Sequence, residues 1–131
     1  MNLWIDDLRD PKDFRPGEDW HWVKSNTEAI RSINTMVGYI DRIAIDHDIC
    51  HQVDFEKYLG ADYEGCINEY ACCETFEATA RYLALWAEVY KITKMPLEII
   101  TSNTTKVDLY KEVLQSTGDR FDITVNFGGK K

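Results

Sequence analysis

Apolar residues occur along the chain in short runs that stop at acids, turn formers or hydroxyl side chains. Runs of this length, bounded in this way, are typical of buried strands that reach the edge of a sheet. Two of them, residues 3–5 and 43–45, end directly at Asp6 and Asp46. The pattern predicts strands over residues 3–5, 20–23, 43–45, 97–100 and 121–125.

Between the strands, apolar residues recur at the three- and four-residue spacing of amphipathic helices. Ser25 and Glu28 form a capping box, in which each side chain bonds a free backbone amide at the start of a helix. We expect helices from Ser25 to Val37 and over residues 76–90, with an end before Pro96. A last helix is expected to contain Val107, Tyr110, Val113 and Leu114 and to be closed by Gly118.

The alternation of strands and helices predicts the architecture. Such alternation favours a parallel sheet with helices packed against it, here an α/β three-layer sandwich around a mostly parallel five-stranded sheet. Residues 9–17, with Pro11 and Pro16, allow only a loop or a single helical turn. Residues 50–75 lack a clean periodicity, and we interpret them as an insertion after the third strand of one domain that covers residues 1–131.

Three acids are expected at the edge of this sheet where ligands bind, the carboxyl ends of the strands. They are Asp6 and Asp7 after the first strand and Asp46 after the third. Carboxylates brought together repel one another, and a hard divalent cation relieves the repulsion. The sequence therefore predicts that these acids bind Mg²⁺, or Mn²⁺. The alternative is that they are solvated loop acids.

A histidine follows the third strand directly. His47 lies between Asp46 and Asp48, and a neighbouring carboxylate can hold an imidazole for proton transfer near neutral pH. We therefore treat Asp46, His47 and Asp48 as catalytic candidates. The alternative is that His47 is a polar loop residue and that Asp48 is merely exposed.

The charge of the chain restricts its ligands. A formal net charge of −8 disfavours binding along an extended nucleic-acid backbone, so an anionic ligand needs local partners. Thr101, Ser102 and Asn103 precede a helix, where backbone amides attract a phosphate. The alternative is that these side chains serve only as helix caps. Arg9 and Lys130 are the basic residues that we assign to the same ligand.

Composition places the chain among globular proteins. It is 44% hydrophobic and carries four tryptophans, seven tyrosines and five phenylalanines, which predicts a chain that folds alone. No apolar stretch is long enough to span a membrane and no signal-peptide pattern is present, so we expect a cytoplasmic protein. Cys50, Cys66, Cys72 and Cys73 are expected to be free thiols, and their spacing fits no common zinc site.

Three segments carry a resemblance to a known family: residues 4–11 (WIDDLRDP), 45–48 (IDHD) and 100–103 (ITSN). Together they resemble the cyclic-phosphate-processing receiver-like family, a divergent branch of response-regulator receiver domains. The resemblance implies a receiver or flavodoxin-like fold. It also implies activity on cyclic phosphates or related nucleotide ends.

Receiver domains bind Mg²⁺ with an acid pair after the first strand, accept a phosphoryl group on an acid after the third, and contact it with a hydroxyl after the fourth. The matching residues are Asp6 and Asp7, Asp46, and Thr101 or Ser102. Two departures are visible. The lysine that usually follows the last strand is missing from residues 126–129 (NFGG), and residues 101–104 (TSNT) lack the histidine of the cyclic-phosphate branch.

Three hypotheses of function follow. The first is a metal-dependent phosphoesterase that takes a nucleotide or another cyclic-phosphate ligand. The second is a non-enzymatic receiver-like binding or inhibitor protein, of the kind that phages and other mobile elements carry, which grips a basic protein partner through its acidic surface and insertion. The third is phosphoacceptor signalling at Asp46.

Overall fold

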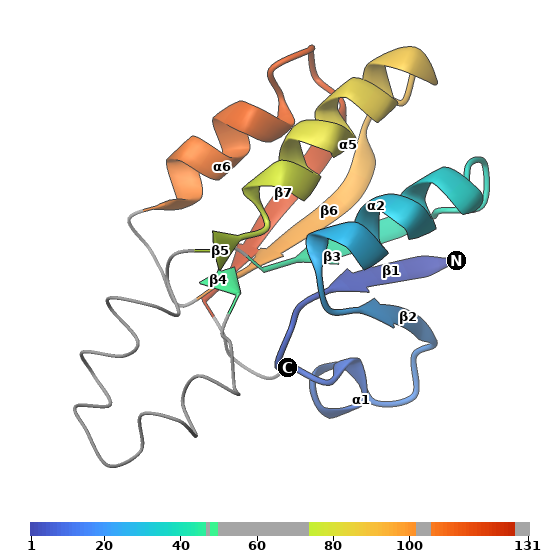
Figure 1. The fold of residues 1–131 in the computed structure, drawn as a ribbon, viewed down its shortest axis with the longest axis vertical. Helices are drawn as coiled ribbons and strands as arrows, with labels where there is room; N and C mark the ends of the chain where they lie inside the picture. Colours follow the sequence, from blue (N-terminus) through green and yellow to red (C-terminus); the bar gives the residue numbers. More distant parts are fainter. Residues whose placement is uncertain (47, 50–73, 102–105, 128–131) are drawn as a thin grey trace.

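The computed structural model describes residues 1–46, 48–49, 74–101 and 106–127 (Figure 1). The strands are β1 (Asn2–Ile5), β2 (Trp20–Val23), β3 (Arg42–Ile45), β4 (Asp48–Ile49), β5 (Glu74–Thr75), β6 (Met95–Ile100) and β7 (Phe121–Asn126). The helices are α1 (Pro11–Phe14), α2 (Asn26–Thr35), α5 (Glu77–Val89) and α6 (Val107–Leu114). None of these helices is long and apolar enough to cross a membrane.

Five of the strands form the main sheet, in the order β2-β1-β3-β6-β7, and every neighbouring pair is parallel. Counted within this sheet the order is 2-1-3-4-5, which is the flavodoxin-like order of doubly wound folds. The predicted α/β architecture with a parallel five-stranded sheet is therefore confirmed. The register places Ile5 of β1 opposite both Val23 of β2 and Ile45 of β3, so the carboxyl ends of these strands are level.

The main core fills the space between one face of the sheet and α2, α5 and α6, which lie on the same side of it in Figure 1. Alternate strand residues point into this core because side chains of a strand alternate between the two faces. From the sheet, the core takes Leu3, Ile5, Ile43, Ile45, Leu97 and Ile99; from the helices, Ala29, Ile33, Ala80, Leu83, Tyr110 and Leu114.

The opposite face of the sheet is covered by the single-turn helix α1 and by aromatic side chains. Trp4 is fully buried there, and its ring meets Trp20 at 5.2 Å and Phe14 of α1 at 6.2 Å between ring centroids. Arg15, at the end of α1, is also buried. Its Nη2 donates to Glu98 Oε1 at 2.6 Å, so the third layer carries an internal ion pair.

Two helix ends differ from the sequence expectation because of the turns that follow them. The helix expected to reach Val37 ends at Thr35, and Gly38 in the next turn has a φ of +85°, which glycine adopts without strain. The last helix ends at Leu114 rather than at Gly118, which lies in the following turn with a φ of +136°.

Two short strands enclose the segment that we interpreted as an insertion. Ile49 of β4 pairs with Glu74 of β5 in an antiparallel ladder, and residues 50–73 lie outside the described residues. Asn26 at the start of α2 supports the ladder, since its Nδ2 donates to the Thr75 carbonyl at 2.9 Å. Asn26 Oδ1 accepts from the amide and the hydroxyl of Thr79, at 3.2 and 2.6 Å, which ties α2 to the first turn of α5.

Candidate functional site

The site is built where two neighbouring strands end. Asp6 follows β1 and Asp46 follows β3, and the amide of Asp46 still donates to the Ile5 carbonyl at 2.8 Å. One carboxylate oxygen from each of Asp6, Asp7 and Asp46 lies within 4.8 Å of the other two. The three acids that the sequence analysis selected as metal ligands are thus brought together, and Asp6 and Asp46 are buried at 1% and 6% exposure.

The turn that carries Asp6 is fixed at several points. Asp6 Oδ1 accepts hydrogen bonds from the amides of Leu8 and Arg9, at 3.0 and 3.1 Å. Two indoles also hold the turn: Trp22 Nε1 donates to the Asp6 carbonyl at 2.6 Å, and Trp4 Nε1 donates to the Arg9 carbonyl at 2.8 Å. The carboxylate of Asp6 therefore has its orientation before any ligand arrives.

Asp46 is held from the helical side of the sheet. The hydroxyl of Tyr110, a residue of α6 that is only 1% exposed, donates to the Asp46 carbonyl at 2.9 Å. This bond joins α6 to the end of β3. The sequence pattern predicts Tyr110 only as part of a helix, although a buried tyrosine hydroxyl needs a polar partner and that need was the available signal.

Arg9 brings the positive charge of the site. Its Nη1 lies 3.1 Å from Asp6 Oδ2 and 3.3 Å from Asp46 Oδ2, so one guanidinium nitrogen bridges both acids. Burial by itself lowers the pKa of the Arg9 guanidinium, but the charges of Asp46, Asp6 and Asp7 outweigh it and raise this pKa above its ordinary value. Arg9 therefore stays charged while it neutralises part of the acid cluster.

The phosphate side of the site is described in part. Thr101 follows β6, is 1% exposed, and its amide donates to the Asn126 carbonyl at 3.0 Å, which continues the ladder with β7. The other candidates of the sequence analysis, His47, Ser102, Asn103 and Lys130, lie outside the described residues. The backbone of Asp48 forms β4, and its side chain is not described either.

The donor set fits a divalent cation. Carboxylate oxygens are the ligands that Mg²⁺ takes in proteins, and three of them converge here at the carboxyl edge of a parallel sheet. Two of these acids are almost fully buried, so their charges need compensation. Asp6, Asp7 and Asp46 are therefore the residues that could hold a metal.

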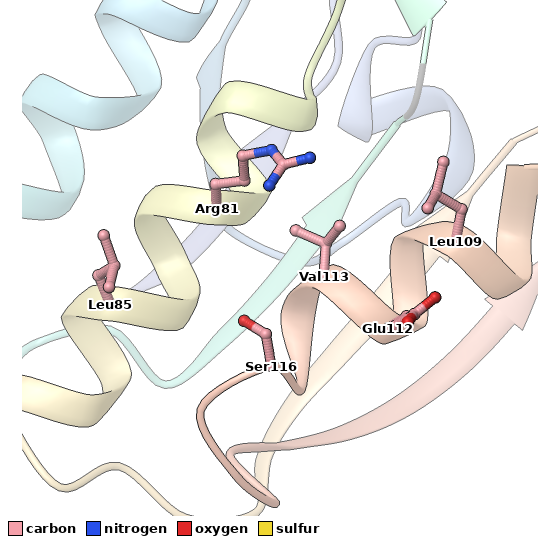
Figure 2. A pocket seen from close by; sticks show the side chains of 6 residues that line it. All are labelled: Arg81, Leu85, Leu109, Glu112, Val113 and Ser116. Atoms are coloured by element: carbon pink, nitrogen blue, oxygen red, sulfur yellow. The ribbon is translucent and has the colours of Figure 1, made fainter.

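The groove between α5 and α6 is a separate feature. Figure 2 shows its lining, with Arg81 and Leu85 on α5, Leu109, Glu112 and Val113 on α6, and Ser116 in the turn that follows α6. None of the three acids lines this groove. The chemistry of the acid cluster is therefore not connected to it.

Comparison with known proteins finds a family that matches most of the chain. No curated protein and no solved structure matches the chain significantly. The sequence profile of the family described as cyclic-phosphate processing receiver domain matches residues 1–115, which contain every strand of the main sheet except β7 and all three acids. Together with the 2-1-3-4-5 strand order, this match means that the chain belongs to the cyclic-phosphate processing receiver domains.

Proposed function

We propose that the protein is a metal-dependent phosphoesterase that hydrolyses cyclic phosphates, in cyclic nucleotides or at nucleic-acid ends. The observation that carries the proposal is the convergence of the carboxylates of Asp6, Asp7 and Asp46 within 4.8 Å of one another. These hard oxygen donors suit Mg²⁺ or Mn²⁺. The cyclic-phosphate family supports the class of substrate.

The reaction joins a water oxygen to phosphorus and breaks one phosphorus–oxygen bond of the ring, and the leaving oxygen takes up a proton. A divalent cation, when bound to the three acids, neutralises charge on the phosphoryl oxygens. His47 follows Asp46 directly in the chain and is the proposed proton carrier, with Asp48 as the group that orients it.

The phosphate is proposed to rest beside the end of β6. Thr101 is the described residue there, and Ser102 and Asn103 follow it in the chain. Arg9 and Lys130 are the cations proposed to bind the same phosphate. This assignment places the anionic ligand where hydroxyls and amides are available and where the metal charge offsets the three acids.

The test is hydrolysis of cyclic mononucleotides and of RNA with a cyclic-phosphate end. Phosphorus NMR measures the rate in the presence of Mg²⁺, Mn²⁺ or EDTA. Asp46→Asn is expected to lower the rate by at least about a hundredfold, because it removes a charged metal ligand. Asp119→Asn is the matched control, since it makes the same change on a 63% exposed side chain at the other end of the sheet. Equal rates in wild type and Asp46→Asn would refute the proposal.

A second function is favoured by one observation. Arg9 already forms ion pairs with Asp6 and Asp46, so these carboxylates have a protein cation beside them. A non-enzymatic protein that binds a basic partner through its acidic surface does not require a metal at these acids. A partner retained by an Asp6, Asp7 and Asp46 triple alanine variant, with no turnover of any cyclic phosphate, would favour this second function.

A further inference from the structure

The side chain of Arg9 stands where a metal would have to bind. Its Nη1 contacts Asp6 Oδ2 and Asp46 Oδ2, and these two acids are also two of the three candidate metal ligands. A divalent cation and a guanidinium cannot both lie against the same carboxylate oxygens without strong repulsion. One of the two cations has to give way, or the metal has to be held by other oxygens.

The backbone of Arg9 does not depend on where its side chain lies. The Arg9 amide donates to Asp6 Oδ1, and the Arg9 carbonyl accepts from Trp4 Nε1, so both peptide groups are held by other contacts. The side chain is 20% exposed, whereas that of Asp6 is 2% exposed. The guanidinium can therefore leave the acids toward solvent while the turn that positions Asp6 stays in place.

The charges of the cluster determine what the displacement does. Three acids and one arginine leave a net charge of −2, which repels an anionic phosphate. A divalent cation brings the sum of the three acids, Arg9 and the metal to zero. It also frees the guanidinium of Arg9, the side chain best shaped to bind phosphate oxygens in pairs. Anion binding at this site should therefore depend on prior binding of the metal.

We propose that Arg9 is the resident cation of the acid cluster, that a divalent metal displaces it from Asp6 Oδ2 and Asp46 Oδ2, and that the released guanidinium then binds the phosphate of the ligand. The inference rests on the metal site of the proposed function. It adds an order of binding, metal before phosphate, and makes Arg9 the residue that enforces this order.

Calorimetric titration of Mg²⁺ tests the displacement without any turnover. Arg9→Met keeps the length of the side chain and removes the charge, and it is expected to bind Mg²⁺ at least about tenfold more tightly than wild type. Arg81→Met is the matched control because Arg81 is 65% exposed and pairs only along α5 with Glu77 among the described residues. Its Mg²⁺ affinity should equal that of wild type.

A second titration with inorganic phosphate tests the release of the guanidinium. Wild type should bind phosphate only when Mg²⁺ is present, and Arg9→Met should bind it about tenfold more weakly than wild type at saturating Mg²⁺. If Arg9→Met is not folded, as shown by the absence of a cooperative unfolding transition, Arg9→Lys is used in its place, because it keeps the charge. It is expected to compete with Mg²⁺ as wild type does.

Each outcome separates the inference from the proposed function. Tighter Mg²⁺ binding by Arg9→Met than by wild type supports the displacement. Equal or weaker binding by Arg9→Met overturns it. In that case, Mg²⁺ binding by wild type still supports the metal site of the proposed function. Mg²⁺ binding by Arg9→Met alone, with none by wild type, shows that the metal does not displace Arg9; it overturns the displacement and refutes a metal-dependent wild-type enzyme. Absence of Mg²⁺ binding in both proteins overturns the proposed function and this inference with it.

Discussion

The buried ion pair between Arg15 and Glu98 offers a quantitative test of the structure. The Arg15 side chain is 2% exposed and lies against the ring face of Trp4, with its Cζ 6.0 Å from the ring centroid. The Glu98 side chain is 19% exposed, and its carboxylate also accepts from Asn126 Nδ2 at 3.1 Å. Removal of either partner leaves the other charge behind. The two single variants should therefore differ in cost.

The magnitude follows from what remains after each change. Loss of one partner of a buried pair costs about 3–5 kcal/mol of unfolding free energy. Glu98→Gln should lie in this range, at about 3 kcal/mol, because Arg15 has almost no access to water. Arg15→Met should cost less, about 2 kcal/mol, because Glu98 keeps Asn126 and some exposure to water.

Urea denaturation of the two single variants and of the double variant Arg15→Met with Glu98→Met measures these costs. At about 0.27 kcal/mol per degree for a chain of this size, a cost of 3 kcal/mol lowers the Tm by about 11 °C. The double variant should be more stable than Glu98→Gln alone, because no charge is left buried. A loss below about 0.5 kcal/mol in both single variants, or a larger loss in Arg15→Met than in Glu98→Gln, would contradict a buried, paired Arg15.

Three further changes are expected to have defined effects. Tyr110→Phe removes the hydrogen bond to the Asp46 carbonyl and should cost about 1–2 kcal/mol in urea denaturation; an unchanged midpoint would contradict this role. Asn26→Ala removes the three bonds to Thr75 and Thr79 and should cost about 2 kcal/mol, with faster hydrogen exchange at the Thr79 amide; unchanged exchange there would contradict it. The pKa of Arg9 is raised, so its stabilising charge is present below its ordinary pKa and is lost only as the pH rises through the raised value. The stability lost in metal-free Arg9→Met should thus be the same at neutral pH and at about pH 10, and a loss that vanishes at the higher pH would argue against the pairing.

The sequence predicted the parts of the site that depend on local pattern. Apolar runs that stop at Asp6 and Asp46 located two strand ends, and alternation with helices predicted that these strands are parallel. That they are also neighbours is a finding of the structure. Thr101 was located at the end of β6 in the same way. Position along one strand sufficed in each of these cases, because a parallel sheet brings its carboxyl ends to one edge.

Contacts between distant side chains could not be predicted in this way. Arg15 and Glu98 are 83 residues apart, and nothing local in either segment indicates the partner. Arg9 was assigned to the phosphate, which stays a prediction, but its contact with two of the acids depends on side-chain orientation in the folded chain. The β4–β5 ladder was not anticipated, because two residues are too few for a periodic pattern.

The pairing of Ile49 with Glu74 brings together the two described segments on either side of residues 50–73. The bond from Asn26 to the Thr75 carbonyl holds this meeting point against α2. The entropic cost of closing a loop rises only with the logarithm of its length, by about 0.6 kcal/mol for each doubling. Segments of different length can be exchanged at this position while β1 and β3 keep their register. The chain between Ile49 and Glu74 can therefore change in sequence and length without disturbing Asp6 and Asp46, which follow β1 and β3.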